Sequence, residues 1–318
     1  MNTARAATAD SLAAMPVTVI MNAGSGHDDK DSSRDQIEQE LTTAGRDHRI
    51  EVAASGEIDT LVRRIVDDAK ANPRIVVAAG GDGTINTVAG TIAGTGVPFG
   101  VIPLGTFNFF ARDLGMPLDP TEATKALLDA HTETRHMAKV NERAFLINAS
   151  VGLYRKIQEE REQFKQRFGR NKLMAGISGL RTLLKEHRSY DVQLEVDGKP
   201  LRLRTPMIFF GFNALQLEKL DLPVAKCPPQ GLLAMLVLRP MSRFELLSFA
   251  VRGTLKGLGD AENLNYYCAS RVDVQLRNAR HVKVAVDGES FECQLPLRFE
   301  VMHDALNVVV PNNPAPRE

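Results

Sequence analysis

The chain has 318 residues, 43% of them hydrophobic, which is enough for a sizeable core in one large or two modest domains. Its 39 Lys and Arg residues balance 39 Asp and Glu residues, so overall charge gives no indication of a nucleic-acid partner. The three cysteines are few, widely spaced and odd in number, so we expect no disulfide framework. The sequence shows neither a signal-peptide pattern nor an apolar run near the roughly 20 residues of a transmembrane helix. We therefore expect a cytoplasmic protein.

Short apolar runs alternate with helical patterns from residue 17 to about residue 130, which indicates a parallel α/β sheet. Ligands of such sheets lie at the carboxyl ends of the strands. The expected elements are strand 17–21, helix 32–44, strand 49–53, helix 58–71, strand 75–79, helix 85–92, strand 100–103 and helix 119–130, the last capped by Asp119.

The first of these strands ends in the loop Asn22-Ala23-Gly24-Ser25-Gly26. The backbone amides of this loop, with the side chains of Asn22 and Ser25, are suited to phosphate or adenosine. An ordinary strand-to-helix loop has the same composition, because Gly and Ser turns are common. Both interpretations stay open for this loop taken alone.

The third strand ends in Gly80-Gly81-Asp82-Gly83-Thr84, directly before a helix. Glycines let the backbone approach a bulky anion, and a helix N-terminus presents free N–H groups to it. Asp82 adds a carboxylate that can hold a metal ion or accept a proton beside that anion. A purely structural turn needs one or two glycines rather than three around an Asp, so we interpret this turn as a nucleotide phosphate site.

The fourth strand leads into the segment 103–115, in which Thr106 and Asn108 are polar groups at the strand's end. Phe107, Phe109 and Phe110 are equally suited to the core. Because all three glycine-rich turns follow strands, we expect them to converge on one site.

From about residue 135 short strands dominate, several with period-two alternation, which favours an antiparallel β-sandwich or barrel. The turn Asp287-Gly288-Glu289 is a good hairpin signal, but two carboxylates two residues apart can also serve a metal ion or a hydroxyl proton. The expected strands are 144–150, 190–196, 201–210, 232–238, 271–276, 281–286, 298–302 and 306–310, with helical insertions at 155–186 and 243–255 and a disordered tail at 311–318.

The order of these four motifs resembles the diacylglycerol kinase catalytic-domain family, which includes bacterial lipid kinases and the sphingosine and ceramide kinases. The resemblance covers about residues 17–311, is most specific at 80–84 and 103–117, and is most similar to a bacterial subgroup. It implies an ATP-binding α/β domain at 16–134 and a lipid-substrate β-sandwich domain at 135–311. It also implies an enzyme of phospholipid metabolism that transfers phosphate from ATP, with Mg²⁺, to a diacylglycerol-like or related lipid hydroxyl between the domains.

The resemblance also implies roles for individual residues. Asp82 would lie beside the phosphates and their Mg²⁺, while Asp287 and Glu289 would act on the substrate hydroxyl or the metal, and we favour Asp287 as the base. The nucleotide-binding residues would be Asn22, Ser25, Gly26, Gly80, Gly81, Gly83, Thr84 and Thr106, and the substrate region would include Asn108, His136 and Arg155.

The chain departs from the family in its second half. His136 stands where the family has an Asp, and Asn213-Ala214 replaces a frequent Asn-Asn pair. Pro228-Pro229-Gln230 replaces carboxylates that bind a structural Mg²⁺ in some bacterial members. Pro and Gln are poor ligands for this hard cation, so we predict that the structural site is absent.

The insertion 155–188 bears on the membrane, because it holds ten Lys and Arg against four Glu, a local net charge of about +6 in a neutral protein. We therefore expect peripheral contact with an anionic membrane surface, although a solvated helix with internal ion pairs has the same composition. Similar proteins dimerise, so a homodimer is a further expectation.

Two other functions remain open. The departures at His136 and 228–230 suit a catalytically weak or inactive regulatory relative that binds lipid or nucleotide. An NAD kinase shares the Gly-Gly-Asp-Gly-Thr turn, but the segment 103–117 and the late Asp-Gly-Glu fit lipid kinases better.

Overall fold

The structure is a computed structural model of the chain that describes residues 9–22, 30–54, 56–152, 189–242, 245 and 263–317. The predicted helix at 155–186, nearly all of the one at 243–255, and the site candidates Ser25, Gly26 and Arg155 lie outside these residues.

The chain divides into two compact units, a first unit of residues 1–137 and 302–318 and a second unit of residues 138–301. The boundary expected after residue 134 differs from this division by a few residues. The larger difference is that the chain returns to the first unit at Met302, whereas the sequence placed residues up to 311 in the second domain.

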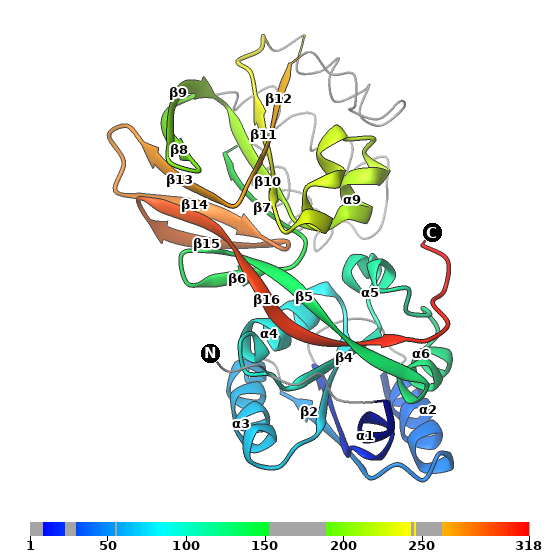
Figure 1. Cartoon of the computed structure of the whole chain (residues 1–318). Coiled ribbons are helices and arrows are strands. Elements are labelled where there is room, and N and C mark those ends of the chain that lie inside the picture. Colours follow the sequence, from blue (N-terminus) through cyan, green and yellow to red (C-terminus); the bar gives the residue numbers. More distant parts are fainter. Residues whose placement is uncertain are drawn as a thin grey trace, which may run out of the picture. The chain divides into compact units, whose positions relative to one another are not determined.

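The first unit is the predicted α/β domain. Its sheet has the order β2-β1-β3-β4-β16, and these neighbours are parallel. In Figure 1 helices α3 and α4 lie on one side of this sheet, and α2 and α6 on the other. The elements are α1 (Ala9–Ala14), β1 (Val17–Asn22), α2 (Lys30–Thr43), β2 (His48–Ala53), α3 (Ile58–Ala71), β3 (Ile75–Gly80), α4 (Asp82–Ile92), β4 (Pro98–Pro103), α5 (Phe109–Asp113) and α6 (Pro120–Leu128).

Hydrophobic periodicity explains why these segments fold as predicted. Strand β3 is buried along its whole length, as a strand covered on both faces must be. Helix α3 buries Val62, Ile65, Val66 and Ala69, which form one stripe at helical spacing. Helix α6 has Asp119 as its cap, with the side chain accepting a hydrogen bond from the Glu122 N–H at 3.1 Å.

Helix α4 begins three residues earlier than the sequence predicts. Gly81 is its extended N-cap, and the Ile85 N–H already bonds the Gly81 carbonyl at 3.0 Å. Asp82, Gly83 and Thr84 are therefore the first helical turn, where an Asp side chain is favoured by the helix dipole.

The second unit is built of antiparallel strands, as predicted. One sheet has the order β16-β13-β8-β9, and β16 pairs with β13 through its first residues. The other sheet has the order β12-β11-β10-β7-β14-β15. β5 and β16 run from one unit into the other. The strands from residue 130 onward are β5 (Ala130–Val140), β6 (Arg143–Phe145), β7 (Asn148–Gly152), β8 (Tyr190–Val196), β9 (Lys199–Thr205), β10 (Met207–Gly211), β11 (Leu233–Leu238), β12 (Leu264–Ala269), β13 (Arg271–Leu276), β14 (His281–Val286), β15 (Glu289–Gln294) and β16 (Leu297–Pro311). Helix α9 (Ala214–Lys219) and the 3₁₀ turns η1 (Pro223–Lys226) and η2 (Pro228–Gln230) follow β10.

The core of this unit lies between the two sheets. The rings of Phe210 on β10 and Phe299 on β16 stack with centroids 3.7 Å apart, and both side chains are fully buried. A second cluster on the outer face of the six-stranded sheet includes Leu217 of α9 and Val224 of η1. The fold class predicted from the sequence, an α/β domain followed by an all-β sandwich, is confirmed.

Several strand boundaries were wrong for local reasons. The expected strand 201–210 is two strands, because Pro206 has no N–H for a ladder and Thr205 bonds the Met207 N–H at 3.1 Å. The expected strands 298–302 and 306–310 are one strand, β16, which runs through the polar residues His303 and Asp304 and pairs with β13, β5 and β4. The sequence missed β5, β12 and β15, whose polar side chains hide their pairing.

The tail predicted to be disordered is instead hydrogen-bonded to the first unit. The Asn312 N–H donates to the Asp129 carbonyl at 3.0 Å, and the Ala315 N–H donates to the Gly115 carbonyl at 2.7 Å. The prediction was wrong because a short polar and proline-rich sequence carries no periodicity, whereas the fold supplies acceptors for its N–H groups.

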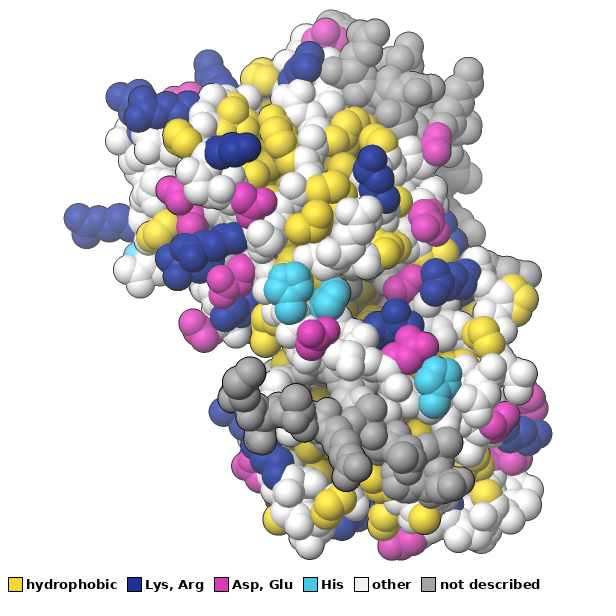
Figure 2. All heavy atoms as spheres, viewed as in Figure 1, with side chains coloured by type: hydrophobic (Ala, Val, Ile, Leu, Met, Phe, Trp, Pro, Cys, Tyr) yellow, Lys and Arg dark blue, Asp and Glu magenta, His cyan; other side chains and the backbone are white. Residues whose placement is uncertain are grey.

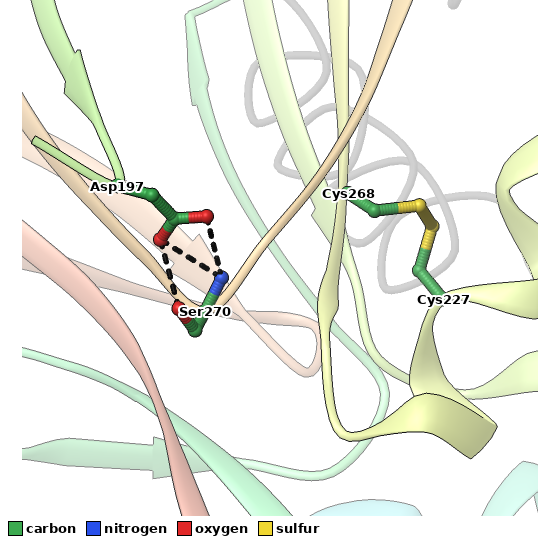
Figure 3. The surroundings of a disulfide bond; sticks show 4 residues. All are labelled: Asp197, Cys227, Cys268 and Ser270. Carbon is green, nitrogen blue, oxygen red and sulfur yellow. Dashed lines mark hydrogen bonds between the residues drawn. A yellow bond between two sulfur atoms is a disulfide. The ribbon is translucent and has the colours of Figure 1, made fainter. Parts of the chain in front are cut away.

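The expectation of a protein without disulfides was also wrong for two of the three cysteines. Cys227 precedes η2 and Cys268 lies on β12, and the two form a disulfide with Cα atoms 5.6 Å apart (Figure 3). Their separation of 41 residues hid the contact from the sequence. Near it, Asp197 accepts hydrogen bonds from the Ser270 backbone and hydroxyl groups, which ties the β8–β9 turn to the start of β13. Cys293 is free and buried.

Candidate active site

Three strand ends of the first unit lie at one edge of its sheet. In the parallel register Met21 of β1 is opposite Ala79 of β3, and Gly80 of β3 is opposite Pro103 of β4. Asn22, the Gly80–Thr84 turn and the loop after Pro103 therefore begin side by side. The convergence expected from the sequence is present among these described residues.

The glycines of these turns are needed for close backbone contact. A Cβ atom on Gly105 would lie 2.6 Å from the Cα atom of Gly81, closer than any side chain tolerates. A Cβ atom on Gly80 would lie 2.7 Å from the Cβ atom of Thr84. The two loops thus touch backbone to backbone, and no side chain separates the first turn of α4 from the loop after β4.

Asn108 locks the second loop. Its backbone has φ 52°, its side chain is 4% exposed, and its amide pairs with both backbone groups of Gly105. The Gly105 N–H donates to Oδ1 at 3.0 Å, and Nδ2 donates to the Gly105 carbonyl at 2.9 Å. Asn108 was assigned to the substrate region, and the structure shows that its amide groups are used within the loop.

Asp82 joins the two loops electrostatically. Its half-buried carboxylate accepts a hydrogen bond from the Phe110 N–H at the start of α5, 3.5 Å away. Burial raises the pKa of Asp82, while bonds from the backbone of Phe110, Asn108 and Phe109 and the charge of Arg112 act in the opposite direction. A partly buried carboxylate with a perturbed pKa marks this turn as a candidate functional site.

The other nucleotide-site candidates differ in accessibility. Gly83 and Thr106 are exposed, whereas Thr84 is 4% exposed and packs against Gly80. Phe107 is 61% exposed and its ring stacks on that of Phe109, with centroids 5.7 Å apart. The sequence allowed for these phenylalanines in the core, but Phe107 lies at the surface.

In the second unit Asp287 is held by the backbone. Its carboxylate accepts hydrogen bonds from three consecutive N–H groups, those of Leu146 (2.9 Å), Ile147 (3.0 Å) and Asn148 (2.7 Å). Asp287 has φ 45° and begins the tight turn between β14 and β15, which leads to the exposed residue Glu289. This carboxylate therefore fixes the start of β7, whatever else it does.

A polar network continues from this point. The Asn148 side chain donates to Gln216 Oε1 at 3.0 Å, and the Gln216 N–H donates to Asn213 Oδ1 at 2.8 Å. Asn213 thereby caps α9. The sequence missed this connection between β7 and α9, because the two segments are far apart in the chain.

His136 lies on β5 in the first unit, half-buried. Its Nδ1 atom accepts a hydrogen bond from the Asp304 N–H at 3.0 Å, and its ring meets that of His303 edge-on at 5.1 Å. His136 was assigned to the substrate region, and the structure shows it joining β5 to β16.

Carboxylate oxygens are ligands that Mg²⁺ prefers. Asp82 supplies one beside the helix N-terminus, which suits the Mg²⁺ that accompanies nucleotide phosphates. Pro228–Gln230 forms the turn η2, in which Pro228 is buried, and offers no carboxylate.

On the face shown in Figure 2, described Lys and Arg side chains lie among Asp and Glu side chains of both units.

Comparison with known proteins agrees with the motifs. Residues 16–140 match the family model of the diacylglycerol kinase catalytic domain. A Staphylococcus haemolyticus protein that bears the name of a lipid kinase is 28% identical over 86% of this chain and 89% of its own. A diacylglycerol kinase of Staphylococcus aureus is 27% identical over 76% of each chain. A crystal structure of a diacylglycerol kinase from Bacillus anthracis matches with a TM-score of 0.68 and 18% identity over 94% of this chain and 97% of that one, which shows a shared fold.

Proposed function

Since residues 16–140 belong to the diacylglycerol kinase catalytic-domain family, we propose that this protein is a kinase that transfers the γ-phosphoryl group of ATP to the hydroxyl group of a diacylglycerol-like lipid. The observation that carries the proposal is the contact between the N-terminus of α4 and the Gly105 loop, with Asp82 beside it. The N–H groups of the Gly81–Gly83 turn are suited to phosphate oxygens, because the helix dipole and unpaired donors both favour an anion there.

Phosphoryl transfer depends mainly on positioning and on neutralising the charge of the phosphate oxygens. Asp82 would hold the Mg²⁺ that comes with ATP, and this ion supplies the positive charge that offsets the phosphates. Thr106 is exposed at the end of the neighbouring loop and would bind nucleotide from the other side of the turn. Asn22, at the end of β1, completes this edge of the site.

The hydrogen bonds of the two candidate bases differ. The Asp287 carboxylate accepts hydrogen bonds from three consecutive backbone N–H groups, those of residues 146–148. Asp82 accepts one hydrogen bond, from the Phe110 N–H at 3.5 Å. The sequence favoured Asp287 as the base; we propose that Asp82 acts on the nucleotide phosphates through their Mg²⁺ and that Asp287 also fixes the start of β7.

The test is transfer of radiolabelled γ-phosphate from ATP, with Mg²⁺, to vesicle-borne diacylglycerol, monoacylglycerol, sphingosine, ceramide and undecaprenol. If a lipid becomes labelled by the wild type but not by Asp82→Asn, the result supports the kinase and identifies its acceptor. If NAD becomes labelled and no lipid does, the protein is an NAD kinase rather than a lipid kinase. ATP binding without transfer to any acceptor would favour a regulatory relative.

We further propose that the enzyme visits anionic membrane surfaces through residues 155–188, whose charge is about +6. No helix among the described residues is long and apolar enough to cross a membrane. Neutralising Arg167, Arg170 and Lys172 should weaken binding to phosphatidylserine vesicles, whereas neutralising the exposed residues Arg202 and Arg204 of β9 should leave it unchanged. Equal losses in the two variants would contradict this docking role.

A further inference from the structure

The segment Asn312–Arg317, which follows β16, makes two separate attachments to the first unit. Figure 1 shows it passing α6 and α5. The first attachment is at Asp129, the residue that ends α6. The Asn312 N–H donates to the Asp129 carbonyl at 3.0 Å, and the Asn312 side chain donates to the Asp129 carboxylate at 2.6 Å. His131 Nδ1 lies 2.8 Å from Asn312 Oδ1 and completes this contact.

The second attachment is at Gly115, just after α5. The Ala315 N–H donates to the Gly115 carbonyl at 2.7 Å. Gly115 has φ 70°, and a Cβ atom there would lie 2.5 Å from the Cβ atom of Pro314. The glycine therefore serves both the left-handed backbone and the direct contact with the segment. Arg317 adds a largely exposed ion pair with Asp113 at 3.8 Å, which contributes little by itself.

Helix α5 cannot maintain its own geometry. It has five residues, far fewer than the roughly 12 that an isolated helix needs in water. At its N-terminus the Phe110 N–H bonds Asp82, and Asn108 pairs with Gly105. Beyond its C-terminus, the carbonyl of Gly115, which follows the C-cap residue Leu114, accepts the Ala315 N–H. Contacts outside the helix thus fix both of its ends.

A continuous path of contacts therefore runs from Ala315 through Gly115 and α5 to Asp82 and Gly105. Of these groups, Asp82 and the Gly105–Thr106 turn belong to the proposed nucleotide site, while Pro314 and Ala315 lie outside it. A shift of α5 along its axis would move the Phe110 N–H away from Asp82, because the two are joined by one long hydrogen bond of 3.5 Å.

We propose that Pro314 and Ala315 are positioning residues of the nucleotide site, which act by fixing the C-terminal end of α5. The segment holds the Phe110 N–H against the Asp82 carboxylate and keeps the Gly105 loop against the start of α4. The effect on nucleotide binding rests on the proposed kinase function, but the fixing of α5 by this segment does not. The proposal predicts a selective effect on nucleotide binding, which general stabilisation of the unit would not produce.

The sharpest variant is Ala315→Pro, which removes one N–H donor at a position that lies between two prolines. Ala315→Ser is the matched control, because it retains the donor. We expect the KM for ATP to rise about fivefold in Ala315→Pro, the size of change that loss of one hydrogen bond produces, with the KM for the acceptor lipid unchanged. A chain that ends at Pro311 should show a larger effect of the same kind.

Amide hydrogen exchange supplies a readout that does not depend on kinase activity. Amides of residues 109–116 should exchange faster in Ala315→Pro than in Ala315→Ser, while those of β3 stay protected. Faster exchange with an unchanged KM for ATP would overturn the positioning role, as would equal rises in the KM values for ATP and for lipid. Unchanged exchange in both Ala315→Pro and the shortened chain would show that the segment does not hold α5. If the wild type transfers no phosphate, the kinase proposal fails, and the exchange data with ATP affinity still test this one.

Discussion

At the scale of single residues, Asp82 connects structure to chemistry. Its carboxylate lies in the first turn of α4 and accepts the Phe110 N–H of α5. An amide oxygen at the same place can accept that bond equally well. A neutral amide cannot take up a proton or offer Mg²⁺ a full negative charge.

Asp82→Asn should therefore abolish transfer while leaving the fold intact. We expect kcat to fall by about 10²- to 10³-fold, the usual loss when one group that stabilises charge in the transition state is removed. Circular dichroism and the melting temperature should stay close to those of the wild type. Radiolabel transfer to the acceptor lipid measures the effect, and turnover like that of the wild type would remove Asp82 from the mechanism.

The raised pKa of Asp82 also makes stability depend on pH. Because burial raises this pKa above its ordinary value of 3.8, the folded protein binds the proton more tightly than the unfolded chain does. The resulting stabilisation is complete below the unfolded-state pKa and is lost as pH rises through the folded-state pKa. The free energy of unfolding of the wild type minus that of Asp82→Asn should thus decrease as pH rises above the ordinary pKa of 3.8. Urea unfolding of both proteins would show this, and a difference that increases with pH would contradict it.

Gly105 and Gly81 give a matched pair of substitutions. Gly105→Ala places a methyl group 2.6 Å from the Gly81 Cα atom, whereas Gly81→Ala meets the Gly105 Cα atom at 3.4 Å. Gly105→Ala should lower the free energy of unfolding by about 1–3 kcal/mol, as overpacking does. Gly81→Ala should cost about 0.5 kcal/mol or less. Urea titrations would measure both, and equal costs would mean that the two loops do not touch as described.

At the scale of elements, the disulfide ties η2 to an outermost strand of the six-stranded sheet. Cys268 is exposed on β12 and Cys227 is buried in the cluster that includes α9 and η1. Closing 41 residues of chain restricts the unfolded state, so Cys268→Ser should lower the free energy of unfolding by about 2–4 kcal/mol. A reducing agent should destabilise the wild type and leave Cys268→Ser unchanged. Equal stability of the wild type with and without reductant would contradict the bond.

At the scale of the whole molecule, the first unit is discontinuous in sequence. Its sheet is completed by β16, which pairs with β4 at Val308 and Phe99. A fragment of residues 1–137 would expose the edge of β4 and should aggregate. The same fragment joined through a flexible linker to residues 302–318 should be monomeric with native circular dichroism. Size-exclusion chromatography distinguishes the two, and a well-folded 1–137 fragment would show that β16 is dispensable.

Local sequence determined most of the elements of the first unit. The stripe of α3, the buried run of β3 and the cap at Asp119 are set by neighbouring residues, since side-chain period and capping act over a few positions. The motifs at residues 80–84 and 103–117 also indicated the family before any contact was known. Their order along the chain was sufficient, because each turn follows a strand of one parallel sheet.

Only the tertiary structure decided which groups are free to act. Three contacts join groups that only the fold brings together. They are the hydrogen bonds from three N–H groups to Asp287, the pairing of Asn108 with Gly105, and the disulfide between Cys227 and Cys268. The attachment of residues 312–317 to Gly115 and Asp129 is of the same kind. Hydrogen bonds and disulfides require particular distances and directions, and a sequence pattern specifies those only within one helix, strand or turn. The sequence therefore determined the elements and the motifs, while the packing of distant segments determined how each candidate residue is used.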